Sequence, residues 1–337
     1  MRKLGFAKCM ATAAFALLGS AVQAEPLIVT TNLTPGHWAS TQGAEPWMKC
    51  VKETTKGGVD FKYFPSGQLA NFFQSLNAVN KGLAQISYIV VPAQSDKLPL
   101  AGITLLPGLG SNVVHLTAAT RAVLDGNGPI AREYAQNRIV PLMINIFPPY
   151  QMMSRKEPFD TLQSLQGRRI STGGGTLMVT LASTGATAVE SAAADVYMGL
   201  QQGTVDGTML SMASVKPYNL QEVIKSTSGN GNFGVANGIW SIDSGVWAKL
   251  PNDHKAALRE CGLKVEKELA KWIDNSMDQV KKELKAGGVK VYDYSDTEIA
   301  KIEKKLEVAR ESYVNRLVKR GLPAKEAYEE YLAALRK

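Results

Sequence analysis

Residues 27–92 of the chain read LIVTTNLTPGHWASTQGAEPWMKCVKETTKGGVDFKYFPSGQLANFFQSLNAVNKGLAQISYIVVP. Strand-like runs rich in β-branched and aromatic residues begin at Leu27, Val59 and Ile86, and each is followed by a turn that contains proline. The two segments between these runs have a helical pattern, and each of them ends at glycine. Three strands that alternate with two helices through short turns predict an α/β fold, with a parallel or mixed sheet flanked by helices.

The rest of the 337-residue chain continues this alternation and then becomes helical. Residues 139–147 and 169–172 are strand-like. Helices are predicted at 253–286 and 296–320, with a short strand at 289–292 between them. Apolar residues recur in these helices at three- and four-residue spacing with charges between them, so we expect them to cover a core rather than to cross a membrane.

The first 24 residues have the pattern of a secretory signal peptide. Arg2, Lys3 and Lys8 precede a short apolar run at residues 10–18, and Val22-Gln23-Ala24 places small residues at the cleavage positions. The apolar run is shorter than the roughly 20 residues that a membrane-spanning helix needs. We therefore expect cleavage before Glu25 and a mature protein in the periplasm.

The composition is that of a folded protein with an ordinary surface. Hydrophobic residues make up 45% and charged residues 20% of the chain, values in the globular range. The net charge is +8, and removal of the signal segment would leave about +5. Lys and Arg alternate with Asp and Glu instead of gathering in a patch with interleaved aromatics, which argues against a nucleic-acid partner.

We expect the protein to be a monomer.

No motif for catalysis or metal binding stands out. The three histidines, His37, His115 and His254, are far apart and have no metal-ligand spacing. The glycine triplet 173–175 lacks the spacing of a phosphate loop, which leaves a tight backbone turn or an anion site at a helix N-terminus as its role. We therefore expect a protein that is not an enzyme and that holds no metal or cofactor.

The mature chain contains two cysteines, Cys50 and Cys261. Export to the periplasm would permit a disulfide between them. Two cysteines on separate helices are also often buried thiols that pack as small hydrophobic side chains. The sequence leaves both possibilities open.

Four segments together resemble the solute-binding proteins of TRAP transporters, in the dicarboxylate-binding (DctP-like) family. They are FPSGQL at residues 64–69, LQGRRI at 165–170, DVYMGLQQGTVDG at 195–207 and KLP at 249–251. The motifs occur in the family's order and cover about residues 27–320.

The resemblance implies a two-lobed periplasmic-binding-protein fold, class II-like, with mixed sheets flanked by helices and long C-terminal helices that bridge the lobes. Residues 25–148 plus about 236–275 would form lobe 1, and 149–235 plus about 276–320 would form lobe 2. Residues 321–337 would form a C-terminal helical tail. Such a receptor captures a small organic solute in the cleft between its lobes and delivers it to the small and large TRAP membrane subunits.

The sequence departs from the family pattern where the family contacts its acidic ligand. Ser171 stands where the pattern has an arginine, and Gln151 falls near a second arginine position. Ala193 replaces an aromatic residue, and Met209 and Leu210 replace a glutamate and an asparagine. A hydroxyl cannot form the bidentate pair that a guanidinium forms with a carboxylate. We therefore expect a wider pocket for a solute that is bulkier and less acidic than the usual dicarboxylate.

The predicted ligand-binding residues are Trp38, Gln68, Asn71, Phe72, Tyr88, Phe147, Tyr150, Gln151, Arg169, Ser171, Ala193, Met209, Leu210 and Trp240. One alternative is an organic-acid receptor whose arginine is displaced to Arg155, Arg168 or Arg169. A periplasmic sensory receptor and an exported enzyme on the same scaffold also remain open. The aromatic residues in apolar runs, such as Tyr88 and Phe147, are equally compatible with a purely structural role.

Overall fold

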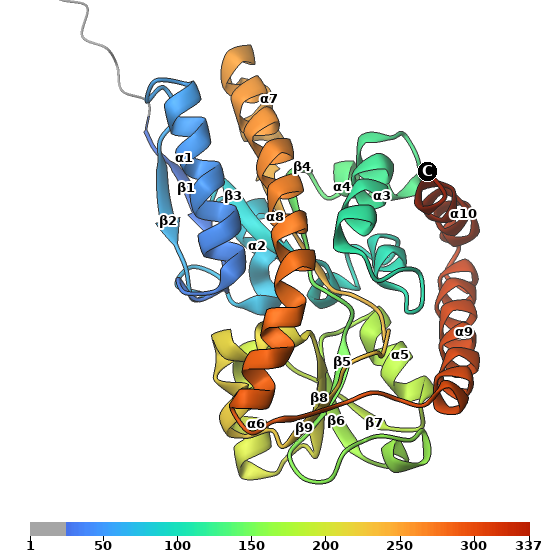
Figure 1. The fold of residues 1–337 in the computed structure, drawn as a ribbon. Helices are drawn as coiled ribbons and strands as arrows, with labels where there is room; N and C mark the ends of the chain where they lie inside the picture. Colours follow the sequence, from blue (N-terminus) through green and yellow to red (C-terminus); the bar gives the residue numbers. More distant parts are fainter. Residues whose placement is uncertain (1–24) are drawn as a thin grey trace, which may run out of the picture.

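The computed structural model describes residues 25–337, which form two lobes with one mixed β-sheet in each (Figure 1). The predicted signal peptide lies outside these residues. The sheet of the first lobe contains β1 (Leu27–Thr30), β2 (Phe61–Phe64), β3 (Ile86–Val90), β4 (Ile139–Ile146) and β10 (Asn237–Asp243). Their order is β2-β1-β3-β10-β4, with β10 antiparallel to both of its neighbours. The α/β fold and the mixed sheet are confirmed.

The sheet of the second lobe has six strands. They are β5 (Gln151–Ser154), β6 (Arg169–Thr172), β7 (Thr187–Glu190), β8 (Gly207–Leu210), β9 (Ser226–Ser228) and β11 (Lys290–Tyr292). Their order is β11-β9-β5-β8-β6-β7. The chain enters this lobe through residues 147–150 and returns to the first lobe through residues 229–236, so two extended connections join the lobes.

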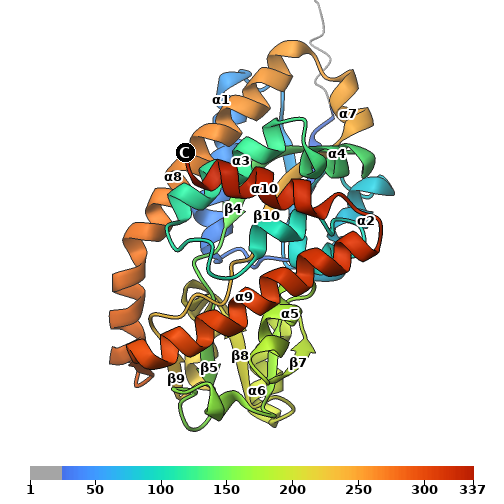
Figure 2. The same cartoon turned by 90° about the vertical axis from the view of Figure 1, so that its right-hand side faces the viewer.

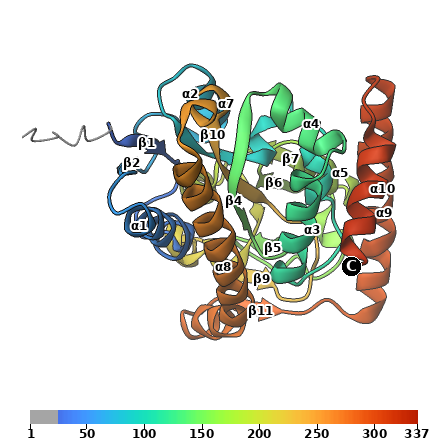
Figure 3. The same ribbon diagram turned by 90° about the horizontal axis from the view of Figure 1, so that it is seen from above.

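Helices flank both sheets (Figure 3). They are α1 (Glu45–Thr54), α2 (Ser75–Asn80), α3 (Val113–Asp125), α4 (Pro129–Gln136), α5 (Thr176–Ser183), α6 (Val196–Gln202), α7 (Ser244–Lys249), α8 (Asn252–Ala286), α9 (Asp296–Lys319) and α10 (Ala324–Leu335). No helix in the described part of the chain is both long and apolar enough to span a membrane.

The two long helices bridge the lobes, as expected (Figures 1 and 2). Asp274 of α8 accepts hydrogen bonds from the first two amides of α3 in the first lobe, and the far end of α8 leads into β11 of the second. The α9 helix holds the second lobe through Glu298, which accepts from the Leu162 amide at 2.9 Å. It holds the first lobe through Tyr313, whose hydroxyl donates to the Pro99 carbonyl at 2.8 Å. The α10 helix packs on α3.

Cys50 and Cys261 form a disulfide between α1 and α8. This observation decides between the bond and the two free thiols that the sequence left open. Both helices lie on the sheet of the first lobe, where Trp47 of α1 donates its indole N–H to the Leu258 carbonyl of α8 at 3.1 Å. The disulfide therefore braces one lobe and leaves the connection between the lobes free.

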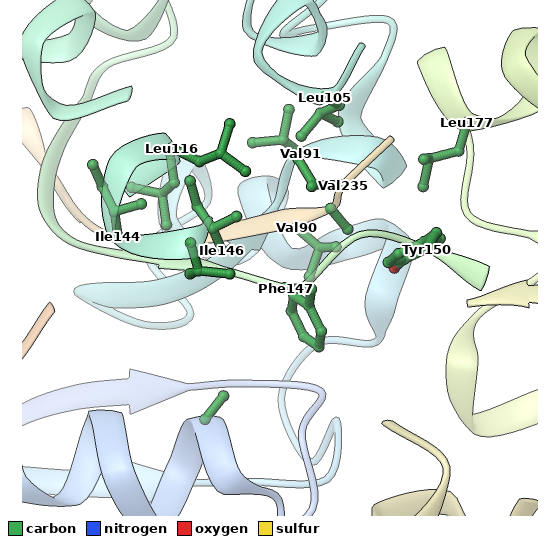
Figure 4. Packing of buried hydrophobic residues seen from close by; sticks show 14 of the residues in the cluster. Val90, Val91, Leu105, Leu116, Ile144, Ile146, Phe147, Tyr150, Leu177 and Val235 are labelled. Atoms are coloured by element: carbon green, nitrogen blue, oxygen red, sulfur yellow. The ribbon is translucent and has the colours of Figure 1, made fainter. Parts of the chain in front are cut away.

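The hydrophobic core is continuous from one lobe to the other. Figure 4 shows Ile144 and Ile146 of β4, Phe147 and Tyr150 on the connection that follows, and Leu177 of α5 in the second lobe. Burial of this apolar surface is the main force that holds the elements together. The aromatic side chains between β4 and β5 therefore lie where the two lobes meet.

Candidate functional site

A small cavity lies between the lobes, beyond the carboxyl ends of strands from both sheets. Its wall consists of Asn32, Leu33, Phe72, Tyr88, Val90, Pro92, Phe147, Tyr150, Thr172, Gly173, Ser191, Ala193, Val196, Thr208, Leu210, Ser214, Tyr218 and Ala236. Ligands of α/β proteins bind at this edge because parallel strands and their loops converge there. The cavity volume is about 40 Å³. One water molecule needs about 10–15 Å³ on the same scale, so the cavity as it stands has room for only a few water molecules.

The glycine triplet 173–175 brings the two lobes close together at the cavity. A Cβ atom on Gly174 would lie 2.7 Å from the carbonyl oxygen of Pro92 in the other lobe, and one on Gly173 would lie 3.2 Å from Pro92 Cβ. Gly175 adopts a φ of 60°, which favours glycine. Of the two roles that the sequence left open, this geometry supports the tight backbone turn.

Several polar groups on the wall are satisfied by the protein itself. The Tyr88 hydroxyl donates to Asn145 Oδ1 at 3.1 Å. Thr172 donates to the Met209 carbonyl at 3.0 Å, and Thr208 donates to the Ser171 carbonyl at 3.1 Å. These hydrogen bonds tie neighbouring strands together and leave these side chains with little capacity for a ligand.

Four other wall residues carry polar groups that the described residues leave without a partner. Asn32 Oδ1 and Ser214 Oγ are buried and make no hydrogen bond to any group within residues 25–337. Within the same part of the chain, the hydroxyls of Tyr150 and Tyr218 also form no hydrogen bond. Buried polar groups normally have partners. The unpartnered groups of the wall therefore mark where a solute can form hydrogen bonds.

The described wall contains no Arg, Lys, His, Asp or Glu side chain. Burial raises the pKa of the Tyr150 and Tyr218 hydroxyls, so both stay neutral and can donate at any physiological pH. No cluster of residues suited to a metal ion occurs in the part of the chain that the structure describes. The site is thus a neutral, largely aromatic chamber with a few hydrogen-bonding groups.

Six of the predicted binding residues do line the cavity: Phe72, Tyr88, Phe147, Tyr150, Ala193 and Leu210. Phe72 lies on the turn after the 64–69 motif, and Tyr88 belongs to β3. Phe147 and Tyr150 come from the connection between the lobes.

Four other predicted binding residues, Gln68, Asn71, Trp240 and Met209, do not line this cavity. Gln68 and Asn71 are exposed, and the Asn71 side chain caps the turn after it by accepting from the amides of Phe73 and Gln74. Trp240 is buried on β10 against Tyr88 and Trp47. Met209 points away from the cavity because side chains alternate along β8, where its neighbours face the cavity.

Gln151, Ser171 and Trp38 are also buried without lining the cavity. Gln151 Oε1 accepts from the Gly231 amide at 2.9 Å, and its Nε2 donates to the Gly231 carbonyl at 2.6 Å. These two hydrogen bonds hold Gly231 in a buried position. The composition of the glycine-rich segment around Gly231 would instead suggest an exposed surface loop. Ser171 is enclosed in β6, where its hydroxyl lies 3.5 Å from the Gly207 carbonyl. Trp38 lies behind Phe147.

Arg169 points out of the second lobe instead of into the cavity. Its guanidinium pairs with Asp206 at 3.3 Å and donates to the Gly203 carbonyl at 2.9 Å. Arg155 lies against the same glycine, and Arg168 is exposed. None of the three arginines proposed as substitutes lines the cavity.

Sequence reasoning missed most of the hydrogen-bonding wall. Asn32 lies two residues after the end of β1, so the rule that ligands bind beyond strand ends could have found it. Ser214 and Tyr218 come from short 3₁₀ turns after β8, where no periodic pattern exists. Thr172 stands one residue beyond Ser171, at the very end of β6.

Comparison with known proteins places this architecture in a family. The family model DctP, described as bacterial extracellular solute-binding protein, family 7, matches residues 31–316. The chain is 23% identical over 319 residues to the outer membrane transporter protein TsaT of Comamonas testosteroni, covering 94% of this chain and 93% of that protein.

Solved structures show the same fold. A marine metagenome TRAP solute-binding protein specific for aromatic acid ligands, in complex with metahydroxyphenylacetate, matches with a TM-score of 0.86 and 16% identity, over 92% of this chain and 98% of that one. A TRAP solute-binding protein from Rhodoferax ferrireducens T118 with copurified benzoate matches with a TM-score of 0.84 and 17% identity, over 92% of this chain and 97% of that one. The two lobes, the interlobe cavity and the family match over most of the sequence lead to one conclusion: the chain belongs to the DctP family of TRAP solute-binding proteins.

Proposed function

We propose that the protein is the extracytoplasmic receptor of a TRAP transporter and captures a small, planar, uncharged organic solute with an aromatic ring. The loaded receptor then delivers the solute to the small and large membrane subunits. The observation that carries the choice of solute is the interlobe cavity, whose described wall includes five aromatic rings and contains no ionisable group other than tyrosine.

The charge of the solute follows from the cost of desolvation. A carboxylate that enters a closed apolar cavity loses its hydration, and without a nearby cation this costs several kcal/mol. The alternative of an organic acid held by a displaced arginine would need Arg155, Arg168 or Arg169 at the wall, and all three lie elsewhere. An uncharged polar group needs only the neutral partners that Asn32, Ser214, Tyr150 and Tyr218 offer.

The size and shape of the solute follow from the wall. Five aromatic rings surround the cavity: Phe72, Tyr88, Phe147, Tyr150 and Tyr218. Flat rings pack well against another flat ring. Two relatives of the same fold were solved with single-ring aromatic acids, benzoate and metahydroxyphenylacetate. The cavity of about 40 Å³ gives no support to the bulkier solute expected from Ala193. It is also smaller than the roughly 150 Å³ of a cavity that binds benzene, so we propose a solute no larger than one substituted ring, which the lobes admit by moving slightly apart.

Export by the predicted signal peptide fits a family whose members work outside the cytoplasm. The family and its solved relatives are binding proteins, which favours capture of the solute over its chemical conversion. A sensory receptor would share this binding site but not the membrane subunits. Loss of solute uptake in a strain that lacks the protein separates transport from sensing.

The test compares two probes of almost identical shape, benzamide and benzoate. Mass spectrometry of material released from the purified protein identifies any copurified solute, and thermal shift and calorimetry measure both probes. Since ligands stabilise the folded state by mass action, benzamide should raise the melting temperature more than benzoate and bind at least about 10-fold more tightly. Tighter binding of benzoate would refute the uncharged solute and restore the organic-acid receptor.

A further inference from the structure

One tryptophan connects the lobes without lining the cavity. Trp38 lies in the first lobe, between β1 and the π-helical turn Ser40–Ala44 that leads into α1. Its indole N–H donates to the carbonyl of Ala213 in the second lobe at 3.1 Å. Only 6% of Trp38 is exposed, so the hydrogen bond is shielded from competing water. It is a direct polar link across the cleft.

The link lies immediately behind the cavity wall. The Trp38 ring packs edge-on against Phe147 with ring centroids 4.9 Å apart, and Phe147 lines the cavity. The acceptor residue Ala213 precedes Ser214, a second wall residue, in the short turn Met212–Ser214. The bond therefore helps to hold two wall residues in position around a solute. One is the aromatic Phe147 in contact with Trp38, and the other is the polar Ser214 next to Ala213.

The other side of Trp38 faces the surface. Its ring lies 6.2 Å from that of Trp272 on α8, and both residues line an open groove of about 790 Å³ between the lobes. The groove also receives Lys216 of the second lobe, which pairs with Glu283 of α8 at 3.5 Å. That ion pair is exposed and contributes little, so the buried bond of Trp38 is the stronger connection on this side of the cleft.

We propose that Trp38 is a positioning residue that fastens the second lobe to the first when the receptor closes, and so slows the release of solute that it does not touch. The proposal rests on the proposed function only in that the lobes close around a solute, and not on the class of that solute. In an open receptor the Trp38–Ala213 bond does not exist, so its removal should act on the closed state alone.

The chain offers a matched control for this idea. Trp47 also donates its indole N–H to a backbone carbonyl at 3.1 Å, but its acceptor, Leu258, lies in the same lobe. W38F and W47F each keep an aromatic ring and each remove one buried indole hydrogen bond. Stopped-flow dissociation of benzamide and benzoate, with thermal melts of the solute-free proteins, compares the two variants.

W38F should raise the dissociation rate of a bound probe by about 2- to 10-fold, the range for one buried hydrogen bond. The association rate should stay unchanged, and the melting temperature of the solute-free protein should fall less than in W47F, because only the closed fraction of the molecules loses a hydrogen bond. W47F should lower the melting temperature and leave the dissociation rate unchanged. The proposal is overturned if W38F lowers the melting temperature as W47F does and leaves dissociation unchanged.

Should neither probe bind, the proposed solute class fails but the role of Trp38 is still tested. Small-angle X-ray scattering then compares the solute-free proteins. A larger radius of gyration for W38F than for wild type and W47F supports the proposal, because fewer molecules are closed. Equal radii for all three proteins overturn it.

Discussion

Acidification should open the receptor through His37, which is buried where the two lobes meet. Its ring packs against Trp38 and Phe147 of the first lobe and against Tyr218 of the second, with centroid distances of 5.0, 5.8 and 5.6 Å. Nδ1 accepts a hydrogen bond from the Ala39 amide at 3.0 Å, so the proton of the neutral ring is on Nε2. Nε2 has no partner within residues 25–337. Burial lowers the pKa of His37 to about 3.

The sign and size of the effect follow from this pKa. When Tyr218 moves away with the second lobe, His37 meets water and its pKa returns to about 6.5. The open form then binds a proton below pH 6.5 while the closed form stays neutral, so closure is fully favourable above pH 7 and is lost as the pH falls. Affinity should fall about 10-fold for each pH unit below 6, which gives about 30-fold, or 2 kcal/mol, at pH 5.

Calorimetry with benzamide from pH 7.5 to 5.0 measures this effect, because benzamide itself does not titrate there. Of the three rings packed on His37 only Tyr218 can ionise, and burial raises its pKa. His37→Asn keeps an acceptor for the Ala39 amide and removes the titration, so its affinity should not change with pH. His115→Asn, an exposed control, should behave as wild type. A wild-type affinity that changes less than about 3-fold, or an unchanged slope in His37→Asn, would refute the reasoning.

Three further predictions concern the cavity and the fold. Tyr218→Phe removes a hydroxyl without a protein partner among the described residues, so the affinity for benzamide should fall about 3- to 10-fold by calorimetry with an unchanged melting temperature; equal affinity would exclude a hydrogen bond to the solute. Gly238→Ala places a methyl group where the Tyr88 ring packs, and should weaken binding more than about 10-fold and lower the melting temperature; normal binding would show that Tyr88 can move freely. Replacement of Cys50 and Cys261 by serine should lower the free energy of unfolding in urea by about 2–4 kcal/mol, with unchanged affinity because the disulfide lies within one lobe; a loss of affinity would contradict that location.

The fold could be predicted because its signals are local. The β-branched run of β3 is buried on both faces in the middle of the sheet, as its continuous apolar sequence indicates. The long α8 and α9 carry three- and four-residue periodicity over many turns, and their observed ends lie within a residue of the predicted ones. The Cys50–Cys261 bond joins residues 211 positions apart, and a local sequence pattern cannot predict that two such distant cysteines pair.

The residues that line the cavity were easiest to predict near the ends of strands. Tyr88, Phe147 and Tyr150 lie on or beside strands, and the sequence placed them in the cleft, whereas Ser214 and Tyr218 lie on irregular turns that the sequence did not single out. An aromatic residue in an apolar run can face the cavity or the core, and the sequence does not say which. Such a residue is buried on either face of the sheet, and only the packing of the folded protein determines whether it faces the cavity or the core.

The reason to expect an uncharged solute has also changed. Of the five positions that differ from the family pattern, Ser171, Gln151 and Met209 are buried in the second lobe away from the cavity, and only Ala193 and Leu210 line it. The absence of an arginine at those positions is therefore not sufficient by itself. Across the whole described wall, every hydrogen-bonding side chain is neutral. A receptor that closes such a wall over its solute has no local charge with which to offset a charge on the solute, and this is the reason for proposing a neutral one.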